Sequence, residues 1–280
     1  MGFSFLSWNI EHFRANIPTF SERLRRVADH IKSHDPDIFG LFEIEDINIL
    51  QLMQVEFPDY SFGITDGPQS MEIVVGWRNG VFDQAMFTQK REFKNYNPFL
   101  RPGALLTVRQ GAVIYNLLFL HTDSGTDAAA FGNRFEMFDN VWKLRKAIER
   151  KEPNLPPPAN TAHVIVMGDL NTMGLFYPTP AKKNALVDTA RELLVIQSLA
   201  SKVGMTLLPK DFGETFFNGT LRSNLDHIVA DSDIAFVPQI DAAGNPSPVR
   251  VRGWNELAGQ AQLDFINFVS DHCSLYAEIA

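Results

Sequence analysis

Polar residues that can hold a metal ion or move a proton lie beside short apolar segments throughout this 280-residue chain. They are Asn9, Glu43, His121, Asp169, Asn171, Asp226, Asp271 and His272. Each one alone has an ordinary structural explanation, such as a turn, an ion pair or a buried histidine with satisfied hydrogen bonds. Because all of them are expected at the ends of apolar strands, a shared site explains the set better than separate coincidences.

The residue types suit the hydrolysis of a phosphoester. A hard cation such as Mg²⁺ prefers oxygen ligands, so Glu43, supported by Asp271 or Asn9, can hold it while a substrate phosphate fills the remaining positions. The attacking water must also be oriented and deprotonated, and Asp169 or His272 can take that role.

Three further residues fit the same reaction. Asp226, expected on a neighbouring strand, would fix the tautomer of His272 and stabilise its charged form. Asn171 stands beside Asp169 and would act with it. His121 would donate a hydrogen bond to a phosphoryl oxygen in the transition state.

The segment VIVMGDLNT, residues 164–172, carries two of these side chains. Its apolar half, 164–167, predicts a buried strand, and Gly168 frees the backbone where that strand ends. If strand geometry continues through Leu170, Asp169 and Asn171 leave the same face. The alternative is an Asx-type turn in which both side chains bind nearby backbone only, and the segment by itself favours that turn.

Alternating helices and short strands predict two mixed sheets covered by helices, formed by residues 1–280 as a single domain. Thr19 and Glu22 have capping-box spacing and predict a helix that ends before Pro36. Its apolar residues Leu24, Val27, Ala28 and Ile31 would lie on one face. The other predicted helices span 46–57, 127–150 and 181–203. Predicted strands span 3–10, 38–44, 60–64, 71–78, 104–109, 112–122, 164–167, 224–230 and 274–279. The strand 38–44 is mostly apolar and is expected to be buried on both faces. Residues 88–103 are expected to form a loop.

Composition limits the compartment and the partners. A net charge of −8 argues against binding of nucleic acid by bulk charge, although a local basic patch or a bound cation can supply the attraction. The single Cys273 allows no internal disulfide and favours a reducing compartment. Neither a leader nor a long apolar run is evident, so we expect a cytoplasmic chain without stable membrane insertion.

Six motifs now stand in order along the chain. They are SWNI (7–10), LFEIE (41–45), HTDSG (121–125), GDLNT (168–172), SNLDHI (223–228) and SDHCSL (270–275). In this order they resemble the endonuclease/exonuclease/phosphatase superfamily of DNase I-like, metal-dependent phosphoesterases. The resemblance covers residues 7–275 and implies a four-layer α/β sandwich, with two face-to-face mixed β-sheets flanked by helices and a site at one edge.

The resemblance also implies roles for the motif residues. Asn9 and Glu43 would serve the metal, with Asp271 near it. Asp169 and Asn171 would position the nucleophilic water and the scissile phosphate. The acid/base and phosphate-stabilising pair would be Asp226 with His272, and the general base is divided between Asp169 and His272. His121 matches the histidine that many members place on the phosphate, and abasic-site repair members have another residue there.

Three positions depart from the family pattern or are ambiguous. Phe42 stands where members commonly have Gln before the metal-binding Glu, which removes one polar neighbour. His227 stands where an aromatic residue is common, and strand alternation predicts that it faces away from the site. Glu45 has two equally supported roles, which are to assist the metal or to open the following helix.

The substrate side of the site is less defined. Arg101 resembles the Arg-Pro segment that some members place beside the phosphate, with plain loop solvation as the equal alternative. For Arg134 a structural ion pair is the better explanation. The predicted loop from Thr88 to Gly103 mixes basic and aromatic side chains, which can track a nucleic-acid strand or form an ordinary solvated face. The loop from Asp211 to Arg222 is equally undefined.

We therefore expect an enzyme that uses Mg²⁺, with Mn²⁺ or Ca²⁺ as alternatives, to hydrolyse a phosphodiester by in-line attack of water. A DNase-like nuclease is the first hypothesis, with nucleic acid as its partner. The rival is a small-molecule or lipid phosphoesterase of the sphingomyelinase or inositol-phosphatase type. A catalytically inactive binding protein of the same fold is the alternative from another class, and the intact residue set argues against it. Protein partners stay unknown.

Overall fold

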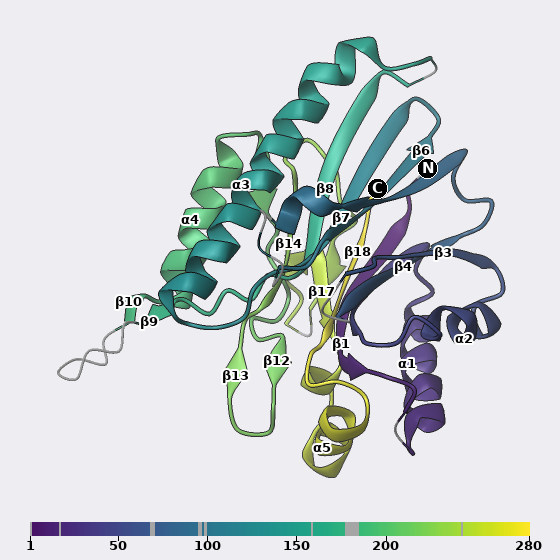
Figure 1. Ribbon diagram of the computed structural model, residues 1–280, viewed down its shortest axis with the longest axis vertical. Coiled ribbons are helices and arrows are strands. Elements are labelled where there is room, and N and C mark those ends of the chain that lie inside the picture. Colours follow the sequence, from purple (N-terminus) through teal and green to yellow (C-terminus); the bar gives the residue numbers. More distant parts are fainter. Residues whose placement is uncertain are drawn as a thin grey trace.

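Two six-stranded sheets lie face to face with helices on their outer sides (Figure 1). The computed structural model describes residues 2–16, 18–67, 71–94, 97, 100–157, 159–176, 185–241 and 243–280. The predicted four-layer α/β sandwich with two mixed sheets is confirmed.

The first sheet has the strand order β17-β18-β1-β2-β4-β3. Its strands are β1 (Ser4–Phe13), β2 (Ile38–Ile44), β3 (Tyr60–Ile64), β4 (Glu72–Arg78), β17 (Val249–Arg252) and β18 (Ser274–Glu278). Strands β1 and β2 are parallel and are joined by α1 (Phe20–His34), whereas every other pair is antiparallel. A parallel pair needs such a crossover connection, which places α1 outside the sheet.

The second sheet repeats this plan with the order β11-β14-β8-β7-β6-β5. Its strands are β5 (Gln84–Lys90), β6 (Gly103–Gln110), β7 (Val113–His121), β8 (Thr161–Asp169), β11 (Met205–Leu207) and β14 (Asp226–Asp231). The one parallel pair is β7 with β8, joined by α3 (Ala128–Lys151). Each sheet therefore has a parallel pair whose two strands end together at one edge.

Shorter elements complete the fold around these sheets. The remaining helices are α2 (Ile49–Glu56), α4 (Thr189–Ser201), α5 (Gly259–Phe268) and the 3₁₀ turns η1 (Arg91–Lys94), η2 (Glu152–Asn154) and η3 (Trp254–Glu256). The short strands are β9 (Leu175–Phe176), β10 (Ala185–Val187), β12 (Phe216–Phe217), β13 (Arg222–Ser223), β15 (Gln239–Ile240) and β16 (Pro246–Ser247). No helix in the described part of the chain is both long and apolar enough to cross a membrane.

The central strands bury both of their faces, because each sheet is covered on two sides. Along β2, Ile38 and Phe42 point into the core between the sheets, while Phe39 and Leu41 pack under α1 and α2. In β8, Ile165 and Met167 fill the inter-sheet core, while Val164 and Val166 pack under α3 and α4. Continuous apolar runs are typical of such strands, and the prediction that 38–44 is buried on both faces is confirmed.

The first helix has the predicted apolar face but not the predicted cap. Leu24, Val27 and Ile31 are buried as expected. The capping box was wrong, because the Thr19 side chain makes no capping hydrogen bond and the Glu22 carboxylate pairs with Arg25 and Arg26 instead.

Two longer predictions were also wrong in part. The expected loop 88–103 begins with the end of β5 and continues as η1, whose Phe93 is fully buried; residues 95, 96, 98 and 99 lie outside the described residues. The expected helix 181–203 is β10 followed by α4, which begins at Thr189 after the Asp188 side chain caps its first turn. Residues 181–184 lie outside the described part.

Candidate active site

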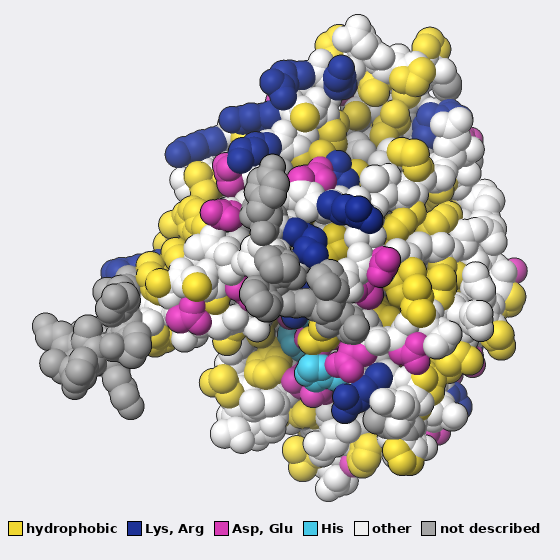
Figure 2. All heavy atoms as spheres, in the orientation of Figure 1, with side chains coloured by type: hydrophobic (Ala, Val, Ile, Leu, Met, Phe, Trp, Pro, Cys, Tyr) yellow, Lys and Arg dark blue, Asp and Glu magenta, His cyan; other side chains and the backbone are white. Residues whose placement is uncertain are grey.

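The motif residues of both sheets meet at one edge of the sandwich. Asp169 ends β8 and lies in register with His121, which ends β7, and with Asp226 on β14. Because β14 runs antiparallel to β8, Asp226 begins its strand and does not end it, contrary to the prediction. Glu43 lies near the end of β2 in the other sheet. Figure 2 shows histidine and acidic side chains gathered on this part of the molecule.

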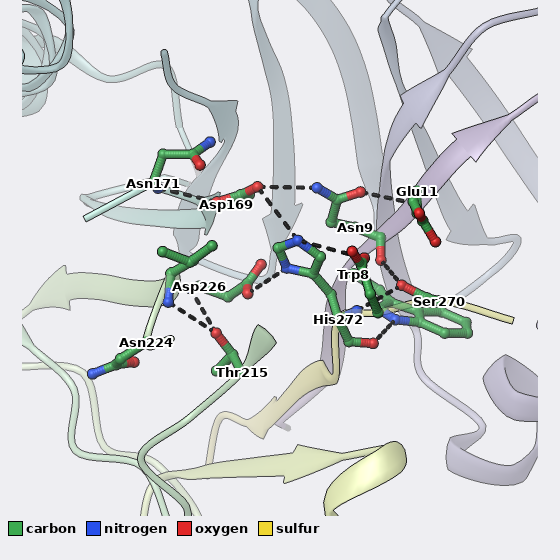
Figure 3. A network of polar contacts seen from close by, with 12 residues as sticks. Trp8, Asn9, Glu11, Asp169, Asn171, Thr215, Asn224, Asp226, Ser270 and His272 are labelled. Carbon is green, nitrogen blue, oxygen red and sulfur yellow. Dashed lines mark hydrogen bonds and ion pairs between the residues drawn. The ribbon is translucent and has the colours of Figure 1, made fainter. Parts of the chain in front are cut away.

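Asn9 connects the two sheets at the site. Its Nδ2 atom donates to Glu43 Oε1 and to Asp169 Oδ2, both at 3.0 Å. Its Oδ1 atom accepts the backbone N–H of Glu11 at 3.0 Å (Figure 3). The Asn9 side chain is fully buried, so one amide fixes the separation of two carboxylates that come from different sheets.

His272 is held between carboxylates (Figure 3). Its Nδ1 atom lies 2.8 Å from Asp226 Oδ2, while its Nε2 atom lies 3.9 Å from Asp169 Oδ2 and 3.8 Å from Asp271 Oδ1. Burial alone would lower the pKa of His272, but the charge and hydrogen bond of Asp226, with the charges of Asp169 and Asp271, raise this pKa to about 10. The imidazole is therefore protonated at neutral pH and both ring nitrogens are donors.

Burial acts in the opposite direction on the neighbouring carboxyl groups. Burial, then the charge of Asp226, raises the pKa of Asp169 to about 7. Burial also raises the pKa of Asp271 to about 6. A carboxyl group whose pKa lies near neutrality can accept a proton from water and release it again.

The turn after β8 uses the Asp169 carboxylate both to bind nearby backbone and to face the site. The strand does not continue through Leu170, because Asn171 adopts a left-handed backbone with φ of 44° and its N–H donates to Asp169 Oδ1 at 3.0 Å. That is the Asx-type turn, which the segment by itself favoured. Nevertheless Asp169 Oδ2 faces Asn9 and the histidines, so one carboxylate oxygen shapes the turn while the other faces the site.

His121 faces the same two carboxylates from β7. Its Nε2 atom lies 3.7 Å from Glu43 Oε1 and 3.6 Å from Asp169 Oδ2. Its Nδ1 atom is buried and has no hydrogen-bond partner among the described residues. Burial, followed by the charge of Arg101, keeps the pKa of His121 well below its usual range, so the ring is neutral and carries one N–H.

The two arginines differ in their surroundings. Arg101 Nη1 donates to the Thr122 carbonyl at 3.3 Å, and its buried Nε has no partner among the described residues. Burial lowers the pKa of Arg101, which the charges of Glu43 and Asp169 oppose. Arg101 therefore brings a donor to the edge of the site, and this is not the plain loop solvation of the alternative.

Arg134 forms the expected structural ion pair. Both Arg134 and Glu192 are fully buried, with Nε 2.8 Å from Oε1. Arg134 also donates to the carbonyls of Asp123, Gly125 and Gly174, and Glu192 Oε2 accepts the Gly174 N–H at 2.7 Å. The pair thus ties the loop that follows His121 to the loop that follows Asp169.

The donors at this edge fit a hard divalent cation. Ligand atoms of Glu43, His121 and Asp169 all lie within 4.8 Å of one another. Asp271 Oδ1 is buried and lacks a hydrogen-bond partner among the described residues. The charged His272 Nε2 lies 3.8 Å from this oxygen, too far for a hydrogen bond, so a cation bound there would satisfy the oxygen.

The ambiguous positions have definite contacts. Glu45 Oε1 lies 2.5 Å from His12 Nδ1 and Oε2 lies 3.6 Å from Arg14, so Glu45 does not open α2. The His227 ring contacts the Thr172 hydroxyl at 2.9 Å and the Asn224 carbonyl at 3.2 Å, which is a structural role. Phe42 belongs to the inter-sheet core.

Three supporting residues were missed. The Thr215 hydroxyl accepts the Asp226 N–H, the Ser270 hydroxyl accepts the His272 N–H, and the buried Lys210 ammonium donates to the Asp226 carbonyl. Ser270 opens the SDHCSL motif, so its position beside His272 could have indicated its role. Thr215 and Lys210 lie outside every motif, and the sequence did not indicate their roles.

The family model described as "Endonuclease/Exonuclease/phosphatase family" matches residues 6–272. A search of the curated proteins found no match.

Solved structures share the fold. Truncated Caenorhabditis elegans TDP2 is 17% identical with a TM-score of 0.62, covering 99% of this chain and 97% of that chain. D. rerio TDP2 complexed with a single-strand DNA product is 16% identical with a TM-score of 0.62, covering 100% and 99%. ANGEL2, described as a 2′,3′-cyclic phosphatase and bound to adenosine-2′,3′-vanadate, is 12% identical with a TM-score of 0.63, covering 99% and 95%. At these identities the likeness concerns the fold alone.

Proposed function

Because the chain belongs to the endonuclease/exonuclease/phosphatase family, we propose that it is a divalent-metal-dependent phosphodiesterase that uses an activated water for in-line attack. The observation that carries the proposal is the convergence of Asn9, Glu43, Asp169 and the Asp226–His272 pair at one edge. Residues of this kind supply the metal ligand, the base and the phosphate donor that such hydrolysis needs.

Glu43 and Asp271 would hold Mg²⁺, with Mn²⁺ or Ca²⁺ as alternatives. Asn9 would serve the metal indirectly, because its Nδ2 orients the Glu43 carboxylate while its Oδ1 is occupied by the Glu11 N–H. When bound, the cation supplies neutralisation of charge on the phosphate and on the leaving oxygen.

Asp169 would accept the proton of the attacking water, with Asn171 beside it. Asp226 fixes Nδ1 of His272, so Nε2 is left to donate to a phosphoryl oxygen. His121 would donate to the same phosphate through Nε2, which faces Glu43 and Asp169, and Arg101 would donate to it through its guanidinium. In this proposal Asp169 is the general base, and His272 is the charged donor to the phosphate.

Among diesters, nucleic acid is our first candidate and a small molecule or lipid is the second. D. rerio TDP2, which has the same fold, was solved with a single-strand DNA product, and Arg101 brings a guanidinium to the site. The second candidate is supported by the net charge of −8 and by ANGEL2, described as a cyclic phosphatase. A catalytically inactive binding protein has less support, because it has no use for the complete set of groups. A cytoplasmic location stays a prediction.

A substrate panel tests this proposal. The protein is incubated with plasmid DNA, single-stranded DNA, an aryl phosphodiester, an aryl phosphomonoester and sphingomyelin vesicles, with Mg²⁺ or with chelator. We expect metal-dependent cleavage of the aryl diester and of DNA. Cleavage of sphingomyelin in place of DNA would favour the second candidate, and the absence of turnover on the whole panel would contradict the enzyme.

A further inference from the structure

A cavity of about 570 Å³ lies directly beside the site, between the end of β1, the first turns of α1 and the end of α5. Its lining includes Glu11, His12, Arg14, Arg26, Asn267 and Phe268. None of these residues has a role in the proposed chemistry. The volume lies in the range of small-ligand sites, which is roughly 300–1,000 Å³.

The wall between this cavity and the site is a strained piece of backbone. Glu11 and His12 are consecutive non-glycine residues with φ of 45° and 43°, in the left-handed region that such residues rarely adopt. Arg23 stabilises this conformation, because its Nη2 donates to the carbonyls of Ile10 and Glu11, both at 2.6 Å, and to Val269 at 3.0 Å. Strain that the surroundings maintain in this way is typical of functional sites.

The same backbone is bonded to the metal-side residues. The Glu11 N–H donates to Asn9 Oδ1, and Figure 3 shows Glu11 beside Asn9 on the side away from Asp169. The His12 N–H donates to Glu43 Oε2 at 3.0 Å, whereas Glu43 Oε1 faces Asn9. The order across the site is therefore Asp169, Asn9, Glu43, His12 and then the cavity.

This order gives the direction of the reaction, a step that rests on the proposed function. In-line displacement places the attacking water and the leaving group on opposite sides of the phosphorus. If Asp169 positions the water, the leaving group departs past Glu43 towards His12. The first space that it meets there is the cavity.

We propose that this cavity is the leaving-group subsite, and that it takes a polar, ring-bearing group of nucleoside size. Phe268 is 48% exposed, and the Arg26 guanidinium lies 5.9 Å from the centre of its ring. An exposed ring with a guanidinium beside it can stack on a base. Charged side chains on the rest of the lining leave no continuous apolar wall for an acyl chain.

The experiment compares two diesters that differ in leaving group. Thymidylyl-thymidine releases a nucleoside, and bis(4-nitrophenyl) phosphate releases a small phenol. We expect Phe268→Ala and Arg26→Ala to lower kcat/KM for the dinucleotide about tenfold and for the aryl diester by less than about twofold. The matched controls are Leu263→Ala, an exposed apolar residue of α5, and Arg25→Ala, an ion-paired neighbour on α1. Neither lines the cavity, and both should leave the two rates unchanged.

Each other result contradicts the subsite. Equal losses on both diesters would mean that Phe268 and Arg26 act on the fold or on the chemistry, and unchanged dinucleotide rates would mean that the cavity is not used. A wild-type enzyme that cleaves the aryl diester but not the dinucleotide would overturn the nucleoside assignment while the proposed function stands. If the wild-type enzyme cleaves neither diester, the leaving-group subsite and the proposed function are both contradicted.

Discussion

The Nδ1 atom of His272 lies 2.8 Å from Asp226 Oδ2, while the Nε2 atom of the same ring faces Asp169 at 3.9 Å. One carboxylate thus fixes the orientation of the imidazole and stabilises its charge, and the opposite nitrogen faces Asp169. The Thr215 hydroxyl and the Trp8 indole hold the backbone of the two partners in place. The pair can therefore be tested separately from the rest of the site.

Asp226→Asn should lower kcat about 10²–10⁴-fold on an aryl phosphodiester, because the amide cannot stabilise the charged imidazole. The matched control is Asp231→Asn at the other end of β14, where the carboxylate accepts the Val164 N–H and pairs with Arg145. That variant should lose stability and keep its kcat. Equal kcat values in the two variants would contradict the role of Asp226.

The Arg134–Glu192 pair should affect turnover more than folding. The single variant Arg134→Met leaves an unpaired buried carboxylate, which should lower the unfolding free energy by about 3–5 kcal/mol. The double variant Arg134→Met with Glu192→Met removes both buried charges, so it should be more stable than the single variant. The loops after His121 and Asp169 lose their shared anchor, so kcat should fall about 10²-fold. Steady-state kinetics and urea unfolding on the same samples separate the two effects.

The control for that experiment is Arg145→Met. Arg145 also forms a mostly buried ion pair, with Asp231, but at the opposite end of β8 from Asp169. We expect lower stability and an unchanged kcat. A double variant at Arg134 and Glu192 that turns over at the wild-type rate would show that the pair does not position the loops.

Acid should destabilise the protein through His30. Burial lowers the pKa of His30 to about 3, with smaller contributions from His34 and Arg252, and the ring packs on Trp8. The unfolded chain then binds the proton first, so stability is fully present above the unfolded pKa of about 6.5 and falls as the pH drops towards about 3. This one group should account for about 1.4 kcal/mol of unfolding free energy lost between pH 7.5 and 5.5.

His30→Phe should remove that part of the pH dependence. The Ser274 hydroxyl, which contacts the His30 ring at 2.9 Å, retains its hydrogen bond to the Arg252 carbonyl. Urea unfolding at the two pH values measures the difference. An unchanged loss of stability in His30→Phe would assign the effect to other groups, such as His34, whose pKa burial lowers to about 4.

Gly168 should tolerate no side chain. Its φ is 143°, and an added Cβ would lie 2.0 Å from the Leu120 carbonyl oxygen across the β7–β8 pair. Gly168→Ala should therefore destabilise the fold by about 2–4 kcal/mol. Gly132→Ala on the exposed side of α3 meets nothing within 4 Å and should stabilise by about 0.5–1 kcal/mol. Chemical denaturation of both variants tests the contrast, and a mild effect at Gly168 would contradict the close approach.

The sequence predicted the layers and the meeting of the motif residues because the central strands are buried on both faces. Such strands are apolar runs, and the first polar residue after one, such as His121 or Asp169, marks the edge of the sheet. The edge strand β5, in contrast, has a mixed composition and exposed or half-exposed residues, so its first part was not predicted and residues 88–90 were assigned to a loop. Helix α5 buries only Ile266, so its sequence also lacks a clear apolar pattern.

Local sequence patterns could not predict contacts between segments that are distant in the chain. The sequence predicted a helix at 127–150, but no local pattern indicated that α3 buries Arg134, which Glu192 meets from α4. The left-handed Glu11 and His12 depend on Arg23 and had no glycine to signal them. Nothing in the order of residues marks Thr215 as the partner of Asp226.

Metal-dependent hydrolysis at the Asp169 side of the site is the central prediction for this protein. The direct measurement is the rate of bis(4-nitrophenyl) phosphate hydrolysis as Mg²⁺ is added to chelator-treated protein, for the wild type and for Asp169→Asn. We predict turnover in the wild type that rises with Mg²⁺ and saturates, and a rate about 10²–10⁴-fold lower in the variant. Turnover that is independent of metal, or that survives in Asp169→Asn, would contradict it.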